Sequence, residues 1–456
     1  MTVSGRVEAL VRPFRPLVDR LFPRGALLLS TLTLATYALG LVRNKVQAEA
    51  YGLSSELDAF LYAFFIPEIV FDAIATSGLA APFVPILVRL RRDDPTGGIR
   101  FAQTAITTIV VVMAVVALLI AAAAPQIAST FASGFDPATR ALYADLLRVA
   151  ALIQVLFAMS LGLRELLVAE RRFLAYQLAP ILYYVGIIGG TVLLAGRLGI
   201  WAAAVGAVAG AVLHVSAALV GVVRLGFPLR PRLAIWTAPF REFVRLMAPK
   251  MVSTPIEPLL FQQFNGLATA FAAGSLGALS FGKDFQGAPV SVIGIAFSLA
   301  VFPVLSQAAV AGDRDGFIRL LRRNVITVAG LSVLAAIALV IVAPLFVRFL
   351  TGGGFDAEDA RLTTLAITGF AVSIPFDALQ YPLARAIYAT ENTTLQVLAS
   401  LAGLVVGVAV ATALAPSLQL IAIPIAYTGA TATKVVLMSV AVVYRVRRLG
   451  VSVASG

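Results

Sequence analysis

About twelve long apolar stretches follow one another along this chain of 456 residues. A helix that crosses the hydrocarbon core of a bilayer needs roughly 20 residues, and each stretch is long enough to supply one. In lipid, such segments must satisfy their own backbone hydrogen bonds, which favours helices. The sequence therefore predicts an all-α integral membrane protein. The expected spans are 26–43, 57–88, 101–124, 142–168, 174–195, 199–223, 242–270, 275–308, 321–347, 358–388, 395–415 and 419–444.

The composition excludes most classes of soluble protein. Hydrophobic residues make up 60% of the chain, charged residues 13%, and the mean hydropathy is +0.95, values outside the range of soluble globular domains. The chain has no cysteine and one histidine, which excludes disulfides and thiolate metal sites. The net charge of +12 comes from short Lys and Arg clusters between apolar runs, a topology signal. We therefore expect membrane lipids, and no nucleic acid, as partners.

Loop charge predicts the orientation, because Lys and Arg are retained on the cytosolic side during insertion. Alternate loops differ sharply in their arginine content. The arginines of the loops that we place inside are Arg89, Arg91, Arg92, Arg100, Arg171, Arg172, Arg224, Arg230, Arg232, Arg241, Arg245, Arg314, Arg319, Arg322 and Arg323. Both termini are therefore expected in the cytosol, with a retained basic arm over residues 1–25 instead of a cleaved signal peptide.

The two halves of the sequence resemble each other. The segment Phe83–Leu87 is echoed by Val301–Leu305, and Arg164 with Glu170 recurs as Arg385 with Glu391, so the matches keep their order and nearly the same separation. Duplication of a six-helix unit predicts two lobes related by a pseudo-twofold axis along the membrane normal, with a cleft between them. A chance match in a low-complexity sequence is the alternative. The expected domains are the arm 1–25, the lobes 26–223 and 242–446, the linker 224–241 and the tail 447–456.

Charged residues inside the expected spans are the candidate site, because an ionised side chain at a helix centre costs about 2.5–3.5 kcal/mol on insertion scales. Two interpretations stay open for each of them, a place in the wall of a central cavity or an ion pair between helices. The candidates are Arg43, Asp58, Glu68, Asp72, Lys250, Glu257, Lys283, Asp284 and Asp377.

Three further polar residues have a weaker claim to function. Arg164 and Arg385 lie near cytosolic helix ends, where a long side chain reaches the headgroups. His214 is the only imidazole, and a lone histidine in an apolar helix is more often a packing residue than a proton relay.

The residues around the first two spans carry a family resemblance. Leu39–Arg43, Tyr51-Gly52, Leu57–Phe60, Ile66-Pro67 and Phe83–Leu87 resemble the opening of the MurJ (MviN) lipid II flippases. That family belongs to the MOP exporter superfamily, which also contains oligosaccharide-lipid flippases and MATE multidrug exporters. The match extends more weakly through Met247–Pro249 and Pro289–Ser306.

The resemblance implies the MOP exporter fold and a carrier that moves a polyprenyl-pyrophosphate-linked glycan from the inner to the outer leaflet by alternating access. Arg43 matches a family arginine and Asp58 a family aspartate. Other family arginines of the cavity fall at Tyr37, Phe71 and Asp284, and the family's glutamate falls at Gly287. Lys250 and Lys283 are candidates to replace the missing charge, as point contacts where guanidinium groups would bind in a bidentate manner.

Two other functions remain open at this level. Another MOP exporter, for an oligosaccharide lipid or a drug, would be coupled to Na⁺ or H⁺ through intramembrane carboxylates. A membrane enzyme would need a carboxylate cluster that holds Mg²⁺ in a loop, whereas the acidic loop residues Asp93, Asp94, Asp313 and Asp315 look like connectors among arginines. We expect a non-enzymatic transporter of the bacterial plasma membrane, driven without a bound cofactor by Na⁺, H⁺ or the membrane potential, and acting as a monomer.

Overall fold

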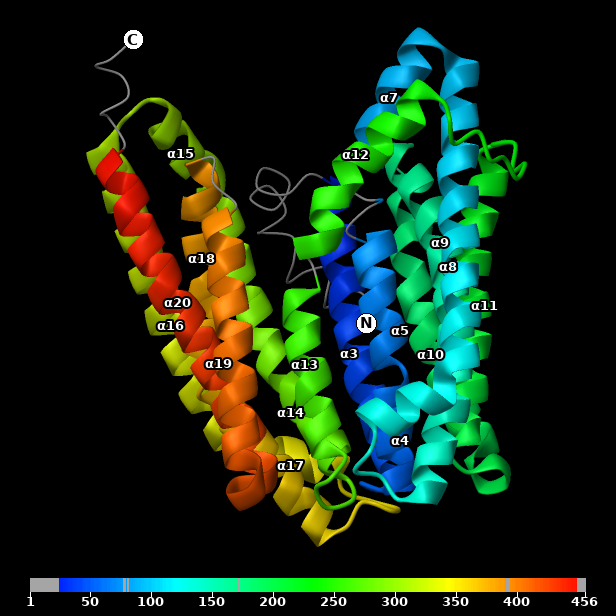
Figure 1. Ribbon diagram of the computed structural model, residues 1–456, viewed down its shortest axis with the longest axis vertical. Helices are drawn as coiled ribbons and strands as arrows, with labels where there is room; N and C mark the ends of the chain where they lie inside the picture. The colour runs from blue at the N-terminus through cyan, green and yellow to red at the C-terminus, as the bar shows by residue number, and fades with distance from the viewer. Residues whose placement is uncertain are drawn as a thin grey trace, which may run out of the picture. The chain divides into compact units, whose positions relative to one another are not determined.

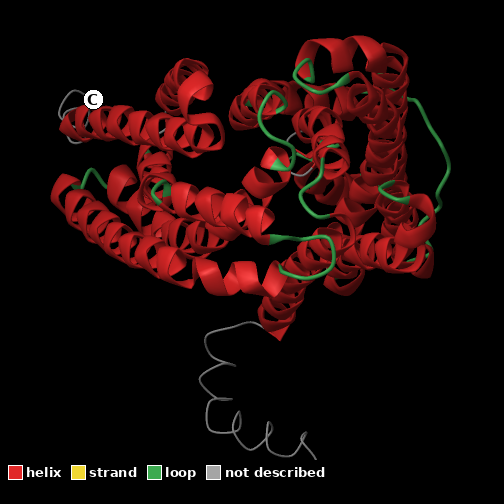
Figure 2. Cartoon of the chain, turned by 90° about the horizontal axis from the view of Figure 1, so that it is seen from below, coloured by secondary structure: helices red, strands yellow, loops and turns green. Residues whose placement is uncertain are grey.

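The computed structural model describes residues 24–76, 79, 82–170, 172–253, 255–390 and 394–448. Over these ranges the chain is helical, apart from loops and one isolated antiparallel β-bridge between Gly352 and Phe355. Figure 2 shows loops only as connections between helices. The arm expected at 1–25 and the tail expected at 447–456 fall almost entirely outside the described residues, as does Glu391.

The helices follow the predicted order, and several predicted spans consist of two to four consecutive pieces (Figure 1). The first half contains α3 (Arg24–Tyr51), α4 (Ser55–Ala63), α5 (Phe65–Phe71), η2 (Asp72–Thr76), α7 (Phe83–Asp93), α8 (Pro95–Phe131), α9 (Pro137–Ala169), α10 (Phe173–Leu198) and α11 (Trp201–Arg224). The second half contains α12 (Ala238–Ser253), α13 (Ile256–Ala268), α14 (Ser275–Pro289), η3 (Val290–Ile295), α15 (Ala296–Val310), α16 (Arg314–Leu350), α17 (Ala357–Ala371), α18 (Ile374–Ala389), α19 (Thr394–Leu418), η4 (Gln419–Ile421) and α20 (Ala422–Arg448).

Nine helical stretches of the described residues are long and apolar enough to cross a membrane. One of them, 394–447, is 54 residues long and contains both α19 and α20. The predicted spans 26–43 and 242–270 are not among the nine. The second of them is divided near Pro255 into α12 and α13, of 16 and 13 residues. The prediction of an all-α integral membrane protein is confirmed.

The order of helices repeats between the two halves at a nearly constant separation along the chain. The helices α4, α8 and α9 begin at Ser55, Pro95 and Pro137, and their counterparts α14, α16 and α17 begin at Ser275, Arg314 and Ala357. The π-helices η2 and η3 occupy corresponding places, beginning at Asp72 and Val290. Because π-helical turns are rare, their recurrence at one place in the repeat supports a duplication over a chance match.

Four aspartates begin the long helices of both halves. Asp136 accepts hydrogen bonds from the backbone N–H groups of Ala138 and Thr139 at the start of α9. Asp356 does the same at the start of α17, the counterpart of α9 in the second half. Asp94 and Asp313 occupy the corresponding places before α8 and α16, where they accept hydrogen bonds from the N–H groups of Gly97 and Gly316. These acidic loop residues satisfy N–H groups that a helix start leaves without a partner.

The described residues fall into two compact units that cut across the sequence halves. One unit lies within Met1–Val46, Ile74–Val116 and Leu152–Ala248, and the other within Gln47–Ala73, Ala117–Ala151 and Pro249–Gly456. Long helices such as α8 and α9 therefore contribute to both units. The expected lobe boundary at 224–241 stays a prediction.

Candidate functional site

A group of charged and polar side chains lies buried among α14, α18 and α20 of the second unit. The Asp377 side chain is 4% exposed and that of Lys283 is 28% exposed, and their charged atoms lie 3.4 Å apart. Nζ of Lys283 also donates hydrogen bonds to Oη of Tyr427 at 2.7 Å and to Oε1 of Gln286 at 2.9 Å. The ammonium group therefore has three polar partners inside the protein.

The carboxylate of Asp377 is equally well satisfied. Its Oδ2 accepts hydrogen bonds from the Tyr427 hydroxyl at 2.7 Å and from Nε2 of Gln286 at 2.8 Å. Its Oδ1 accepts a hydrogen bond from the Gln380 amide. A buried carboxylate is tolerated when an opposite charge and several donors surround it, and Asp377 has both.

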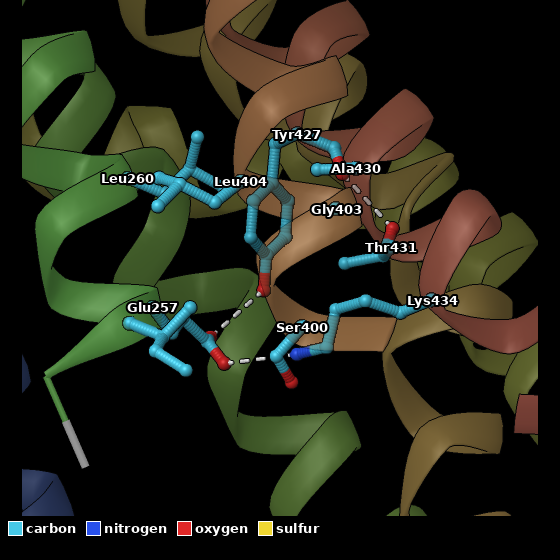
Figure 3. A pocket seen from close by; sticks show the side chains of 10 residues that line it. Glu257, Leu260, Ser400, Gly403, Leu404, Tyr427, Ala430, Thr431 and Lys434 are labelled. Carbon is cyan, nitrogen blue, oxygen red and sulfur yellow. Dashed lines mark hydrogen bonds and ion pairs between the residues drawn. The ribbon is translucent and has the colours of Figure 1, made fainter. Parts of the chain in front are cut away.

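Tyr427 connects this pair to a second one. Its Oη lies 3.4 Å from Oε1 of Glu257 on α13, and Oε2 of Glu257 lies 3.6 Å from Nζ of Lys434 on α20. Figure 3 shows the Tyr427 hydroxyl and the Lys434 ammonium both directed at the Glu257 carboxylate. The Glu257 side chain is 42% exposed, whereas that of Lys434 is 10% exposed. The two pairs form one network with two cations and two carboxylates, so its formal charges balance.

The second pair borders a pocket between α13, α19 and α20. The pocket contains about 280 Å³ of empty volume, part of it open to the surroundings. The residues that line it are Ile256, Glu257, Leu260, Ser400, Gly403, Leu404, Tyr427, Ala430, Thr431 and Lys434. The pocket therefore combines an apolar wall with one accessible carboxylate and two hydroxyl-bearing side chains besides Tyr427.

A glycine makes room for the network, and aromatic rings pack close to it. A Cβ atom at Gly403 would lie 2.7 Å from Cγ of Lys434, so glycine at this position of α19 lets the lysine stem pass between the two helices. The rings of Phe261 and Phe370 lie 5.1 and 5.8 Å from the Tyr427 ring. Nζ of Lys283 lies 4.2 Å from the centroid of the Tyr427 ring, a cation–π distance.

Asp58, a predicted site residue, is 2% exposed and belongs to the second unit. Its Oδ2 accepts a hydrogen bond from the N–H of Gly274 at 2.8 Å, and its Oδ1 accepts one from Gly277 at 2.7 Å. These N–H groups stand at the start of α14, where the helix dipole favours negative charge. The described contacts of Asp58 are those of a helix cap, and its place in a cavity wall stays a prediction.

Arg43 lies in the first unit, half-buried near the end of α3. Its Nε and one terminal nitrogen donate to Oδ1 of Asn44 at 3.1 and 2.6 Å, and Asn44 itself is fully buried. The guanidinium carbon lies 5.4 Å from the centroid of the Tyr184 ring. The group is thus held in place by neighbours, while it keeps some exposure.

The remaining predicted residues have varied positions. Glu68 and Asp284 are exposed, and Asp72 is half-buried at the start of η2. Lys250 lies in α12, and its side chain falls outside the described part of the structure. Three residues of the predicted set, Glu257, Lys283 and Asp377, make the described contacts of the buried network. These three residues take part in ion pairs between helices, and their role in substrate binding stays a prediction.

The residues with weaker claims make aromatic contacts. The guanidinium carbon of Arg164 lies 4.0 Å from the Tyr176 ring centroid, and that of Arg385 lies 5.2 Å from the Phe302 ring centroid. His214 is 6% exposed, and its ring centroid lies 4.9 Å from that of Phe157. Within the described residues Nδ1 of His214 has no hydrogen-bond partner, so its contacts are those of a packing residue.

Sequence reasoning missed Lys434, Tyr427, Gln286 and Gln380. Lys434 carried a usable signal, because it is a lone lysine within the expected apolar span 419–444 and meets the same criterion as Lys283. The tyrosine and the two glutamines carried none, since neutral polar residues are frequent in membrane helices that pack against one another. In the part of the chain that the structure describes, no three His, Cys, Asp or Glu side chains gather closely enough to hold a metal ion.

Comparison with solved structures defines the class of protein. A multidrug resistance MATE family transporter of the MOP superfamily, in an inward-facing conformation, matches with a TM-score of 0.74 at 14% identity, covering 92% of this chain and 96% of that one. A structure described as lipid II flippase MurJ, inward closed conformation, matches with a TM-score of 0.79 at 18% identity, covering 93% and 90%. The fold is therefore that of the MOP exporters, a class of multi-pass membrane transporters.

The sequence narrows this class to one family. The family model described as "Lipid II flippase MurJ" matches residues 47–452, so the chain belongs to the MurJ family. A relative described as lipid II flippase MurJ, from Burkholderia cenocepacia, is 24% identical over 379 residues, which cover 81% of this chain and 73% of the relative. The resemblance inferred from the first two spans is confirmed, and the chain is a multi-pass protein of the bacterial plasma membrane.

Proposed function

We propose that this chain is a flippase that moves lipid II, or a closely related polyprenyl-pyrophosphate-linked glycan, from the inner to the outer leaflet. The observation that carries the proposal is the match of the MurJ family model across residues 47–452. The MATE neighbours share the fold at 14% identity, which supports the class and not a drug substrate. We therefore do not retain the alternative of another MOP exporter.

The physical task is the passage of a pyrophosphate and its sugars across hydrocarbon while the polyprenyl tail stays in lipid. A guanidinium group in a low-dielectric site binds phosphate oxygens in a bidentate manner, so Arg43 is our candidate for headgroup contact. Its partners Asn44 and Tyr184 orient the group before the substrate arrives. Lys283 is the second candidate. Its ammonium group would leave the Asp377 carboxylate and bind a phosphate oxygen of the substrate instead.

Orientation, oligomeric state and energy coupling complete the proposal. Both termini face the cytosol, because the arginine-rich loops follow the positive-inside rule. A single chain suffices, since a duplicated six-helix unit supplies both walls of an alternating-access path. Coupling to H⁺, Na⁺ or the membrane potential would act at Glu257, the carboxylate that the pocket leaves 42% exposed.

The test is complementation of a bacterium depleted of its own lipid II flippase, with growth and the appearance of lipid II in the outer leaflet as readouts. The wild type should rescue both, and Arg43→Ala should lower transport by about 10- to 100-fold, the cost of one or two charge-assisted hydrogen bonds. Arg43→Lys is the matched control, because it keeps the charge and loses the bidentate geometry. Normal transport by Arg43→Ala at equal membrane level would remove Arg43 from the site, and failure of the wild type to rescue would overturn the proposed substrate.

A further inference from the structure

The segment between α11 and α12, with the first turns of α12, presents an outward face that the proposed transport does not use. Trp236 is 84% exposed and Leu233 is 58% exposed. Four arginines of the same segment are also exposed. We call this the linker surface, and it consists of Arg230, Arg232, Leu233, Trp236, Arg241 and Arg245.

The opposite side of this segment is fixed to the first unit. Nε2 of Gln103 on α8 donates a hydrogen bond to the carbonyl of Pro228 at 2.6 Å. One helical turn further on, Oγ1 of Thr107 accepts a hydrogen bond from the N–H of Arg232 at 3.1 Å. Two hydrogen bonds to one face of α8 therefore hold the extended part of the segment and determine which of its side chains face away.

The start of α12 is also fixed to the first unit, by a ring contact and an ion pair. Phe243 is buried, with its ring 5.7 Å from that of Phe101 on α8. The next residue back, Glu242, pairs with Arg89 on α7 at 2.5 Å, and Figure 1 shows α12 beside α7. With Phe243 turned inward, Arg241 and Arg245 lie on the exposed face of α12.

The arginines of the linker surface differ from those nearby. Arg89 and Arg91 pair with Glu242 and Glu170, and Arg100 pairs with Asp94. Among the described residues, none of the four arginines of the linker surface has an ion-pair partner. Four cations beside an exposed tryptophan and leucine therefore remain without a carboxylate partner in the described part of the protein.

The depth of the linker surface relative to the membrane follows from the length of α11, the helix that precedes it. The 24 residues of α11 extend about 36 Å at 1.5 Å per residue, more than the roughly 30 Å of a hydrocarbon core. Arg224, at the end of α11, therefore reaches the headgroup layer, and the linker surface begins just beyond it. Tryptophan is enriched at that level, and arginine pairs there with lipid phosphate.

We propose that the linker surface binds anionic phospholipid headgroups of the inner leaflet, with Trp236 and Leu233 inserted at the level of the upper acyl chains. Lipid is the occupant because the surface continues directly from the spans α8 and α11, and because its four positive charges complement an anionic leaflet. The inference rests on the cytosolic placement of this loop, and it is independent of which substrate the protein carries.

Tryptophan fluorescence tests the proposal. The chain has two tryptophans, so Trp201→Phe leaves Trp236 as the only one. The protein is reconstituted into vesicles that mix phosphatidylglycerol with phosphatidylcholine, with bromine on the upper acyl chain of one lipid at a time. Brominated phosphatidylglycerol should quench Trp236 more than brominated phosphatidylcholine does. Changing Arg230, Arg232, Arg241 and Arg245 to Gln should remove this preference. Each arginine that contacts a headgroup should contribute up to about fivefold to the preference for phosphatidylglycerol.

The matched control is Trp236→Phe, in which Trp201 at the start of α11 reports quenching that the four arginine changes should leave unaltered. The proposal is overturned if Trp236 is quenched by aqueous acrylamide and not by bromine. It is equally overturned if the two brominated lipids quench Trp236 alike, or if the variant with four glutamines keeps the wild-type preference. Failure to rescue a flippase-depleted strain would not alter any of these readings, so the two proposals fail separately.

Discussion

The last two helices of each half form equivalent hairpins, α10–α11 and α19–α20, and the two hairpins pack by different means. In α10–α11 the backbones touch through glycines, since a Cβ atom at Gly186 would lie 2.3 Å from Cα of Gly210. In α19–α20 a charged side chain lies between the helices, because a Cβ atom at Gly403 would lie 2.7 Å from Cγ of Lys434. The first hairpin maximises backbone contact, and the second accommodates an ion pair and a pocket.

Two pairs of residues with the same separation along the chain make the contrast specific. His214 on α11 and Lys434 on α20 lie 220 residues apart, as do Phe157 on α9 and Asp377 on α18, a separation close to that between the starts of the repeated helices. In the first half the histidine packs against the phenylalanine ring at 4.9 Å. In the second half Lys434 and Asp377 are a cation and a carboxylate of the buried network. The two halves thus share helices and caps, and the ion-pair network of Asp377, Lys283, Glu257 and Lys434 lies in the second half.

The glycine contact of α10–α11 gives the largest expected effect. Gly186→Val would place branched carbons where Gly210 backbone lies 2.3 Å from the new Cβ, so the two helices must separate. We expect a loss of about 3 kcal/mol or more of folding free energy, measured as the fraction that stays monodisperse in detergent on heating. Gly189→Val is the matched control, because a Cβ there meets no atom within 4 Å. Equal melting of the two variants would refute the backbone contact.

His214 of the first hairpin and Lys434 of the second give an intermediate effect. Lys434→Met leaves the Glu257 carboxylate without its cation, and we expect a loss of about 1–2 kcal/mol, less than for a fully buried pair because Glu257 is 42% exposed. His214→Met replaces a ring packed on Phe157 and should change stability by less than about 1 kcal/mol. Thermal unfolding of both variants measures the difference.

A double variant sharpens that measurement. Lys434→Met combined with Glu257→Gln should recover most of the loss, since removal of both charges leaves no unpaired ion. An equal loss for Lys434→Met and His214→Met, or no recovery in the double variant, would contradict the claim that the two hairpins differ through this ion pair.

The helix caps, which both halves share, should give the smallest and pH-dependent effect. The pKa of Asp136, in the loop before α9, lies below its ordinary value because the Thr139 hydroxyl and the N–H groups of Thr139 and Ala138 donate to its carboxylate. A folded-state pKa below the unfolded value means stabilisation that is complete above the unfolded pKa and lost as pH falls through the folded one. Wild type should therefore exceed Asp136→Asn in melting temperature at pH 7, with the gap closing below about pH 4.

Thr139→Val serves as the control for this cap, because it removes the largest cause of the lowered pKa and should reduce the gap at neutral pH. A gap between wild type and Asp136→Asn that stays constant from neutral to acidic pH would show that the charge of Asp136 contributes nothing to the cap.

The sequence predicted the site in part. The rule that charges inside apolar spans are functional or paired selected Glu257, Lys283 and Asp377, all of which join the network. The same rule also selected Asp58, whose contacts are those of a cap for α14. The free-energy cost of burying a charge is a property of one residue, so the sequence shows it. The partner that offsets this cost depends on which helices pack together, and the sequence does not show that.

By itself the sequence determined the membrane class, the helical segments and the duplication. It did so because apolar length, loop arginines and repeated motifs are local along the chain and need no knowledge of packing. Only the tertiary structure decided that Tyr427 on α20 bridges Asp377 on α18 and Glu257 on α13, or that Gly403 admits Lys434. These contacts join residues that lie far apart along the chain, and a buried charge is paired or unpaired according to side chains that only folding brings within hydrogen-bonding distance.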